Sequence, residues 1–400
     1  MIEKNLNKYF VDLHVHIGRN ERALPVKVTA SKDLTFANIA WECQVKKGID
    51  IVGIVDCASP RVIEDIEKML NSGEMRELSD GGLRYHDVVT IILGAEIECK
   101  EKKGGLSHQI AYFPYFANIV KFSKIMNKLI SNLNLSSQNS RISAQDFFKI
   151  VDNLDGIVIP AHVFTPYKSV FGSCVERLGE IFCPSTLKKI PALELGLSAD
   201  TFLADRLPEL SGFTFLTNSD AHSLSKIARE YNTILMEKPS YKELLMALKR
   251  ESGRKVVENY GLDPKLGKYN RTFCNECKTK TSELPPITYC KECGSKKITK
   301  GVLDRIIELS NGRDSFSPTH RPPYYYQVAL DFVPGIGKKI REKLFHHFGT
   351  EMNILHKTTF HDLSRIVGPK IATDIISARK GELLLIPGGG GKYGKVSKQP

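Results

Sequence analysis

Histidines and acids recur at the ends of short apolar stretches in this chain, and this pattern limits the possible folds more than any other feature. Residues 212–216 have the composition of a buried strand and run into a polar turn that carries Asp220 and His222. Near the other end of the chain, His14 and His16 close a similar apolar stretch. Alternate residues of a strand point the same way, so each pair can reach into one pocket. Imidazole and carboxylate together are the ligands that a borderline metal ion prefers.

Apolar strand-like stretches alternate with helical ones through the first 240 residues. The strands are expected at 10–16, 49–57, 88–93, 107–113, 156–162, 191–197 and 212–216, and the helices at 31–47, 61–71, 122–133 and 144–154. The first helix has Ser31 or Asp33 as its cap and ends at Gly48. Such alternation indicates parallel βαβ units and predicts a closed or nearly closed α/β barrel, whose chemistry lies at the carboxyl ends of the strands.

Eight side chains fall at these predicted strand ends. They are His14, His16, Asp56, Glu96, His108, His162, Asp220 and His222. A single histidine in such a place is more often a satisfied polar residue than a ligand, but five histidines and three acids at successive strand ends predict a metal site. Eight ligands are too many for one tetrahedral ion and suit two or three. Clustered divalent ions activate water for displacement at phosphorus, so phosphoester hydrolysis is the expected reaction.

The positive charge of the chain is concentrated in its last 160 residues. Residues 241–400 hold 29 Lys and Arg against 16 Asp and Glu, a net of +13, whereas residues 1–240 hold 28 against 29. The asymmetry suggests that the C-terminal part binds a polyanion such as nucleic acid, although a solvated basic surface would have the same composition. No apolar run approaches 18 residues and no secretion signal is evident, so we expect no membrane contact and a cytoplasmic, nucleoid-associated protein.

Four cysteines in two CxxC pairs predict a structural zinc site. The pairs are Cys274 with Cys277 and Cys290 with Cys293, with twelve residues between them. Paired thiolates at this spacing hold a tetrahedral ion, which replaces the core that so short a segment cannot build. A redox role is the alternative, but neither pair opens a helix in a βαβ unit.

Two glycine-containing turns near the C-terminus predict backbone contacts with DNA phosphates. Residues 332–349 resemble a helix-hairpin-helix motif, and residues 363–372 resemble a degenerate second copy. Glycine lets the backbone approach a phosphate, and the following helix N-terminus favours an anion. An ordinary pair of helices is the alternative. The predicted DNA-binding residues are Gly335, Gly337, Lys338, Lys339, Gly368 and Lys370. The glycine- and lysine-rich residues 387–395 are expected to be mobile.

The ordered set of motifs over residues 8–235 resembles the PHP phosphoesterase superfamily. The resemblance implies a distorted seven-stranded (βα)7-type barrel with up to three metal ions, which we expect to be Zn, Mn or Mg. It places His14, His16, Glu96 and Asp220 on one ion, Glu96, His108 and His162 on a second, and His222 on a third.

This chain departs from the superfamily pattern at two places. Cys57 stands where a histidine usually follows the acid of the second motif. No acid follows directly after His16, and Glu21 is the candidate substitute for it. Cys57 is either a soft zinc ligand or a small buried residue, and the second reading is preferred. The number of ions, two or three, is therefore left open.

Several side chains near the ligands are candidates for substrate binding. The loop after His162 mixes aromatic and basic residues and could stack a base pulled from a helix, or be purely structural. Asn218 could read a base edge or brace its turn. Glu194 could be a ligand, a partner of a ligand or a pocket residue. The candidates are Phe164, Lys168, Ser169, Phe171, Glu194 and Asn218.

The order of the parts resembles the endonuclease Q family over nearly the whole chain. We expect a PHP-like barrel in residues 1–262, a zinc module in 263–301, a helix and linker in 302–326, tandem helix-hairpin-helix elements in 327–384 and a Gly/Lys-rich tail in 385–400. The resemblance implies a DNA repair endonuclease that cuts 5′ of deaminated bases (uracil, hypoxanthine or xanthine) or abasic sites. Base flipping would present the lesion, and Asp220, His222 and Glu96 would be the catalytic ligands.

The expected partner is DNA, as a damaged duplex or a single strand, and a replication clamp or other repair proteins are further candidates. Two other functions remain open at this point. A PHP-type phosphatase or exonuclease acting on DNA ends or nucleotides would share every ligand, and a non-catalytic DNA-binding scaffold would have lost some of them. No GxxxxGK[ST] loop occurs, which argues against a helicase-like ATPase.

Overall fold

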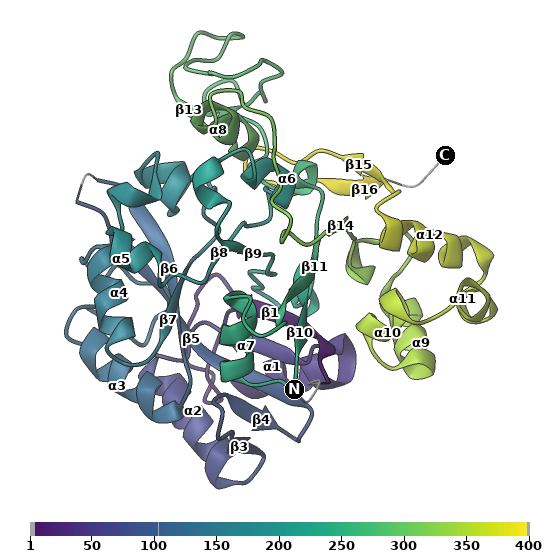
Figure 1. Cartoon of the computed structure of the whole chain (residues 1–400). Coiled ribbons are helices and arrows are strands. Elements are labelled where there is room, and N and C mark those ends of the chain that lie inside the picture. Colours follow the sequence, from purple (N-terminus) through teal and green to yellow (C-terminus); the bar gives the residue numbers. More distant parts are fainter. Residues whose placement is uncertain (1–4, 103, 398–400) are drawn as a thin grey trace.

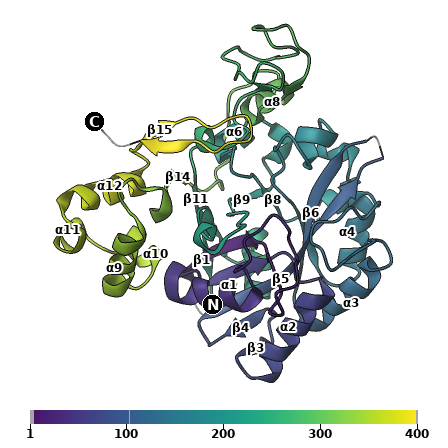
Figure 2. The ribbon, with the colours of Figure 1, turned by 180° about the vertical axis from the view of Figure 1, so that it is seen from behind.

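The chain forms a large body of mixed strands and helices, with two smaller parts attached to it. The computed structural model describes residues 5–102 and 104–397. Strands and helices up to about residue 261 make the body, the green segment around residues 273–309 extends from its upper end, and the yellow-green helices after residue 337 lie at its side (Figures 1 and 2). The predicted mixed α/β class is confirmed.

A mixed sheet of ten strands runs through the body within the described residues. Its strands are β1 (Asn7–Val15), β2 (Ile51–Ile54), β3 (Met75–Glu77), β4 (Leu83–Tyr85), β5 (Val89–Lys100), β6 (Leu106–Phe113), β7 (Ile157–Pro160), β10 (Tyr231–Met236), β11 (Lys255–Gly261) and β14 (Tyr324–Tyr326). The order is β14-β11-β10-β1-β2-β5-β4-β3, and β6 and β7 continue from β5. Every residue of β2 is buried, as expected for a strand that is covered on both faces.

Hydrogen bonds continue from β7 back to β1. Val163 N donates to Glu194 O (2.9 Å) beside β8 (Ala192–Glu194), and β8 pairs in parallel with β9 (Thr214–Leu216). Just beyond β9, Ala221 exchanges two backbone bonds of 3.1 Å with His14 and His16. We call β1, β2, β5, β6, β7, β8 and β9 the strand ring. It brings residues 14 and 220, which are far apart in the sequence, side by side.

The expectation of parallel units throughout is wrong for β6 and β7. The β1, β2 and β5 strands are parallel, but β5–β6 and β6–β7 are antiparallel. For β5–β6 the cause is the short connection between Lys100 and Leu106, since a parallel crossover needs a dozen or more residues. β7 has the direction of β5 and therefore runs antiparallel to the reversed β6. His108 therefore lies near the beginning of its strand, and Glu96 lies within β5 rather than after it. Antiparallel pairing still brings both to the same end of the ring.

Helices cover the outside of the body. They are α1 (Phe36–Glu42), α2 (Pro60–Asn71), α3 (Phe116–Met126), α4 (Ala144–Asp152), α5 (Pro184–Leu187), α6 (Thr201–Ala204) and α7 (Tyr241–Leu248). The first helix begins later than predicted because Thr35, whose hydroxyl accepts from Asn38 N, is the cap. It continues as a π-helical turn and ends at Gly48 as predicted, where φ is +77°. The predicted 122–133 helix is shifted to α3.

The strands β10 and β11 were missed by the sequence analysis. β10 pairs antiparallel with β1 and β11, so it lies at the sheet centre between two partners. Its sequence, Tyr231 to Met236, is rich in residues that favour strands, but it directly follows the polar ligand loop. The predicted body, residues 1–262, includes both segments, but the sequence analysis assigned no strand to either of them.

Four helices follow in the C-terminal part: α9 (Lys338–Phe348), α10 (Glu351–His356), α11 (Phe360–Val367) and α12 (Pro369–Lys380). Gly335 and Gly368 lie in the turns before α9 and α12, with φ near +86° and +82°. A buried ion pair of 2.6 Å between Lys47 Nζ and Glu351 Oε2 ties α10 to the body. Lys338, Lys339 and Lys370 are all exposed at the helix starts.

The glycine-rich tail is folded, contrary to expectation. Strands β15 (Leu384–Ile386) and β16 (Lys395–Ser397) pair as a hairpin. Its loop returns to the segment before the cysteine pairs, since Gly388 N and Gly394 N donate to Lys265 O (2.8 Å) and Leu266 O (2.9 Å). Gly390 has a φ of +60° and packs against the Phe273 ring, where an added Cβ would lie 2.6 Å away. Close backbone packing therefore replaces the flexibility that composition suggested.

Helices long and apolar enough to cross a membrane are absent from the part of the chain that the structure describes.

Glu230 gives the fold a pH dependence that can be measured. It is 1% exposed, Oε1 accepts from Leu262 N (2.9 Å), and burial raises the pKa to about 8. In the unfolded chain this carboxyl titrates near 4.5. Its contribution to the free energy of unfolding is therefore fully present below pH 4.5 and is lost as the pH rises through 8, where the folded carboxyl ionises. We expect Glu230→Gln to raise Tm relative to wild type by several degrees more at pH 9 than at pH 6, because the variant cannot ionise. An exposed Glu67→Gln variant is the control, and an equal Tm difference at both pH values would contradict the account.

Candidate active site

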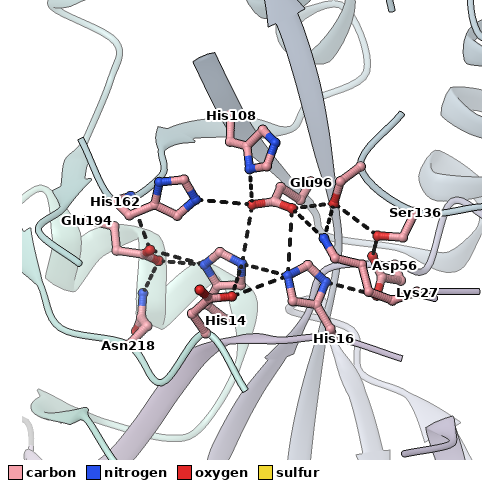
Figure 3. A network of polar contacts seen from close by, with 12 residues as sticks. His14, His16, Lys27, Asp56, Glu96, His108, Ser136, His162, Glu194 and Asn218 are labelled. Carbon is pink, nitrogen blue, oxygen red and sulfur yellow. Dashed lines mark hydrogen bonds and ion pairs between the residues drawn. The ribbon is translucent and has the colours of Figure 1, made fainter. Parts of the chain in front are cut away.

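His14 and His16 form the floor of a buried polar cluster. His14 is the penultimate residue of β1, and His16 follows the strand. Both rings are at most 1% exposed, and their Nε2 atoms lie 3.3 Å apart (Figure 3). The alternation of β1 aims both at one point, as the sequence predicted.

Glu96 is the centre of the cluster. Its Oε1 atom is 3.6 Å from His14 Nε2, 2.7 Å from His108 Nδ1 and 3.5 Å from His162 Nε2. Its Oε2 atom is 3.6 Å from His16 Nε2. The carboxylate therefore faces two histidine pairs at once, and Figure 3 shows it between them.

Asp220 closes the cluster from the loop after β9. Its Oδ1 atom is 3.4 Å from His16 Nε2, 3.6 Å from His14 Nε2 and 3.5 Å from His222 Nδ1. Asp220 has a φ of +44°, which is costly for a residue with a side chain. Arg229 holds this turn, because its Nε donates to Ser219 O (2.7 Å) and its Nη2 to Asp220 O (3.2 Å).

These side chains fit divalent metal ions. Three groups have ligand atoms that all lie within 4.8 Å of one another: His14, His16 and Glu96; His16, Asp220 and His222; and Glu96, His108 and His162. The ligand atoms of one tetrahedral zinc ion lie about 3.3 Å apart, which matches the separations among the first group. Both nitrogens of the buried His108 ring face carboxylates, with Nδ1 2.7 Å from Glu96 Oε1 and Nε2 3.8 Å from Glu98 Oε2. Neither contact has the geometry of a hydrogen bond, so the ring can give its lone pair to an ion.

Two carboxylates orient the histidines from behind. Glu194 contacts His14 Nδ1 at 3.0 Å, and Asp56 Oδ2 contacts His16 Nδ1 at 3.0 Å. Each contact fixes a proton on Nδ1 and leaves Nε2 to face the cluster. Asp56 also accepts from Ile17 N and Ser136, so both of its oxygens have protein donors, and it lies outside the three ligand groups.

The crowded carboxylates strongly favour positive charge. Burial lowers the pKa of His14, but Glu194, Asp220 and Glu96 outweigh it and raise this pKa to about 10. For His222, burial and the neighbouring His16 lower the pKa to about 4 despite Asp220. Protons and divalent ions compete for the same imidazole nitrogens, so metal binding releases protons and weakens as the pH falls.

Most of the predicted substrate-binding residues lie away from the surface. Phe164 and Phe171 are buried and stack on each other at 5.3 Å, so neither ring is open to a base. Asn218 donates to Glu194 Oε2 (2.8 Å) and accepts from Leu13 N, which places it as a brace. Ser169 caps the turn at 170–174. Lys168 is 47% exposed on its side chain and pairs with Glu98 at 2.8 Å.

Cys57 points away from the cluster. It is fully buried, its Sγ donates to Ile54 O (3.1 Å), and burial raises its pKa far above the ordinary value. Cys57 therefore belongs to the apolar core, which agrees with the preferred reading of the sequence.

The sequence analysis missed Lys27, Ser136 and Ser137. Lys27 Nζ donates to Glu96 Oε2 (3.2 Å) and Ser137 Oγ (2.5 Å), and Ser137 also contacts Glu96. The carboxylates of Glu96, Asp56 and Asp220 outweigh burial and raise the pKa of Lys27, which keeps it charged. These residues come from loops without a motif, so only the fold brings them to the site.

The four cysteines of the two CxxC pairs cluster as predicted. Cys274 Sγ lies 3.6 Å from Cys293 Sγ, and Cys277 Sγ lies 3.5 Å from Cys290 Sγ. All four sulfur atoms lie within 4.8 Å of one another, close to the spacing of about 3.8 Å around a tetrahedral zinc ion. The cluster lies between β12 (Phe273–Cys274) and β13 (Ile298–Thr299), ahead of α8 (Val302–Leu309).

A basic and aromatic pocket lies between this module, the loop after His162 and the tail. Its volume is about 530 Å³. Tyr167 and Tyr269 meet edge to face at 5.7 Å, and Tyr167 Oη contacts Thr299 at 2.9 Å. Lys278 and Lys392 are exposed at its rim. Acidic residues are absent from the lining that the structure describes, so the pocket suits an anionic, aromatic ligand.

The chain is similar to known proteins over nearly its whole length. No family model matches it. It is 44% identical over 393 residues to protein YqxK of Bacillus subtilis, covering 98% of this chain and 100% of that one. It superposes with a TM-score of 0.81 and 30% identity on the lesion-specific endonuclease PfuEndoQ from Pyrococcus furiosus, covering 98% of this chain and 95% of that one. The same TM-score and identity hold for endonuclease Q in complex with a 27-mer duplex substrate with an abasic lesion at the active site, where 97% of that chain is covered.

Fold and site together define a metal-dependent nuclease. More particularly, the chain belongs to the endonuclease Q family.

The contact between Glu194 and His14 can be tested without DNA. Glu194→Gln removes the charge that makes His14 a strong ligand, and loss of such a partner typically costs 10–100-fold in metal affinity, so we expect a weakening of about that size. Isothermal calorimetry during titration with Mn²⁺ measures the metal affinity of each variant. Glu67→Gln, on the exposed face of α2, should leave the affinity unchanged. Equal affinity in both variants would mean that Glu194 does not support the ligand.

Proposed function

We propose that this protein is a DNA repair endonuclease that hydrolyses the phosphodiester 5′ of a deaminated base or an abasic site. The observation that supports it best is the complete cluster of His14, His16, Glu96, His108, His162 and Asp220 inside a chain that aligns along 98% of its length with a lesion-specific endonuclease. A scaffold that only binds DNA would have no need to keep this cluster.

In this proposal the strand ring is the distorted PHP barrel, and its metal ions lie between β1, β5 and the loop after β9. One ion would be held by His14, His16, Asp220 and Glu96, and a second by Glu96, His108 and His162. When bound, such ions supply Lewis acidity that stabilises charge developing on phosphoryl oxygens. Glu194 and Asp56 keep the imidazoles oriented, so the scissile phosphate meets a preorganised site.

The C-terminal helices would hold the duplex through its backbone. Gly335 and Gly368 occupy turns of positive φ with nothing within 4 Å of an added Cβ, so a phosphate has room to approach the backbone at both. The Gly368 N–H itself donates to Ser364 O (2.9 Å), so at that turn the phosphate would meet the start of α12 instead. Lys338, Lys339 and Lys370 lie at the same helix starts and add positive charge, and Gly337 directly precedes α9. Such contacts fix the position of DNA without reading its sequence.

The pocket lined by Tyr167 and Tyr269 would receive a nucleotide displaced from the helix. Aromatic rings stack any base, and Lys278 and Lys392 are placed to meet its phosphates. The loop after His162 forms one wall of the pocket, through Tyr167. The next residue, Lys168, pairs with Glu98, and Glu98 Oε2 lies 3.8 Å from His108 Nε2, so the pocket wall is connected to the metal-ligand cluster. Zinc bound by the four cysteines would hold the opposite wall in place.

Cleavage of defined duplexes tests the proposed activity. With Mg²⁺ or Mn²⁺, we expect a single nick directly 5′ of a uracil, hypoxanthine, xanthine or abasic site, and none in an undamaged duplex. Asp220→Ala should lower the rate at least about 100-fold, because it removes a ligand. Asp314→Ala, in the exposed segment after α8, is the matched control. Degradation from the ends of every duplex, or phosphate release from small monoesters alone, would contradict the proposal and indicate a PHP exonuclease or phosphatase.

The pocket has its own test. Tyr269→Leu keeps apolar bulk but removes the stacking surface, so we expect KM for the lesion duplex to rise about tenfold, the effect of one stacking contact, with kcat nearly unchanged. Tyr115→Leu, at the start of α3, changes the same residue type elsewhere on the body and should leave KM as in wild type. Equal KM values for both variants would exclude the pocket as a nucleotide site.

A further inference from the structure

Lys27 brings a cation to Glu96, the central carboxylate of the ligand cluster. Its side chain is 14% exposed, and its Nζ lies 3.2 Å from Glu96 Oε2, on the oxygen that His16 also faces (Figure 3). The ammonium is thus within the group of carboxylates, and Ser137 Oγ accepts a second hydrogen bond from it.

The loop that carries Lys27 is fixed on both sides. Lys27 N donates to Ile17 O (2.8 Å), and Val26 N donates to Gly18 O (2.9 Å). The buried Val26 in turn accepts from Ser136 N (2.9 Å), which joins the loop to the serine pair. These bonds make Lys27 a built part of the site rather than a surface lysine that happens to fold inward.

The three candidate ligand groups cannot all be filled at once. An imidazole nitrogen has one lone pair, so His16 Nε2 can serve either the group with His14 and Glu96 or the group with Asp220 and His222. The other His16 nitrogen is occupied by Asp56. With Asp220 and His16 committed to the first ion, His222 is the one imidazole left for a third, and Cys57 points into the core.

Whichever two groups are filled, a carboxylate oxygen of the cluster faces Lys27, since Glu96 Oε2 lies 3.2 Å from its ammonium. Glu96 contacts the Lys27 ammonium directly, and the charges of Asp56 and Asp220 also favour its charged form. An ammonium can neutralise carboxylates at hydrogen-bonding distance without needing lone pairs from the histidines.

We propose that the site holds two divalent ions and that the Lys27 ammonium is its third positive charge. Lys27 is then a positioning residue, which holds Glu96 Oε2 and Ser137 while Glu96 Oε1 faces His108 and His162. The inference rests on the proposed metal-dependent cleavage.

Metal titration tests this without DNA, so its result is independent of whether the enzyme cuts at lesions. Mn²⁺ is used because thiolates do not favour it, and the cysteine cluster therefore keeps its zinc. We expect two Mn²⁺ ions per wild-type chain. In Lys27→Met, where a repelling charge is gone, we expect Mn²⁺ to bind at least tenfold more tightly than in wild type, or a third ion to be taken up. We also expect kcat on the lesion duplex to fall at least tenfold.

The controls separate charge from structure. Lys68→Met, on exposed α2, should match wild type in both measurements, and Lys27→Arg should bind two ions with near wild-type affinity. A purely structural lysine would give the opposite sign, with weaker Mn²⁺ binding in Lys27→Met, and that result would overturn the proposal. Three Mn²⁺ ions in the wild-type chain would overturn it as well, even if Lys27→Met failed to fold.

Discussion

The burial of several carboxylates around Glu96 is the constraint on which the rest of the structure depends. Glu96, Asp56 and Glu194 are buried, and the partly exposed Asp220 lies beside them. Unpaired charges at the depth of the first three would cost far more than the fold could tolerate. Five histidines, one lysine and the hydroxyls of two serines surround them. Without cations, the mutual repulsion of these carboxylates would destabilise the fold. The same concentration of negative charge lets the cluster bind divalent ions.

The strand ring holds the members of that cluster in place from several directions. β1 supplies His14 and His16, the β5–β6 hairpin supplies Glu96 and His108, and the turn after β9 supplies Asp220 in a backbone conformation that Arg229 holds. Behind the imidazoles, Glu194 and Asp56 determine which nitrogen faces inward. Ligand geometry is thus set by backbone pairing first and by side-chain contacts second, which is how a rigid scaffold preorganises a site.

The attached parts extend the site toward a large polyanionic substrate. The cysteine module and the folded tail share one pocket with the loop after His162, while α9–α12 present exposed lysines and open glycine turns beside the body. The buried pair of Lys47 and Glu351 anchors those helices, so their position relative to the site is part of the fold. The net positive charge of the chain lies in its last 160 residues, which include these attached parts.

The sequence alone identified most of the side chains that meet, since His14, His16, Glu96, His108, His162, Asp220 and His222 all occupy the cluster. Asp56, predicted as a ligand with them, lies behind His16 instead. The sequence also determined the grouping of the cysteines and the α/β class. These signals are local: a period of two in strands, a fixed spacing between thiols, and glycine before a helix. Only the tertiary structure decided what depends on distant segments. It made β6 and β7 antiparallel, buried Phe164 and Phe171, turned Asn218 into a brace, folded the tail onto the module and carried Lys27 to Glu96. Composition does not record such contacts, because each joins residues that meet only after the strand ring has closed.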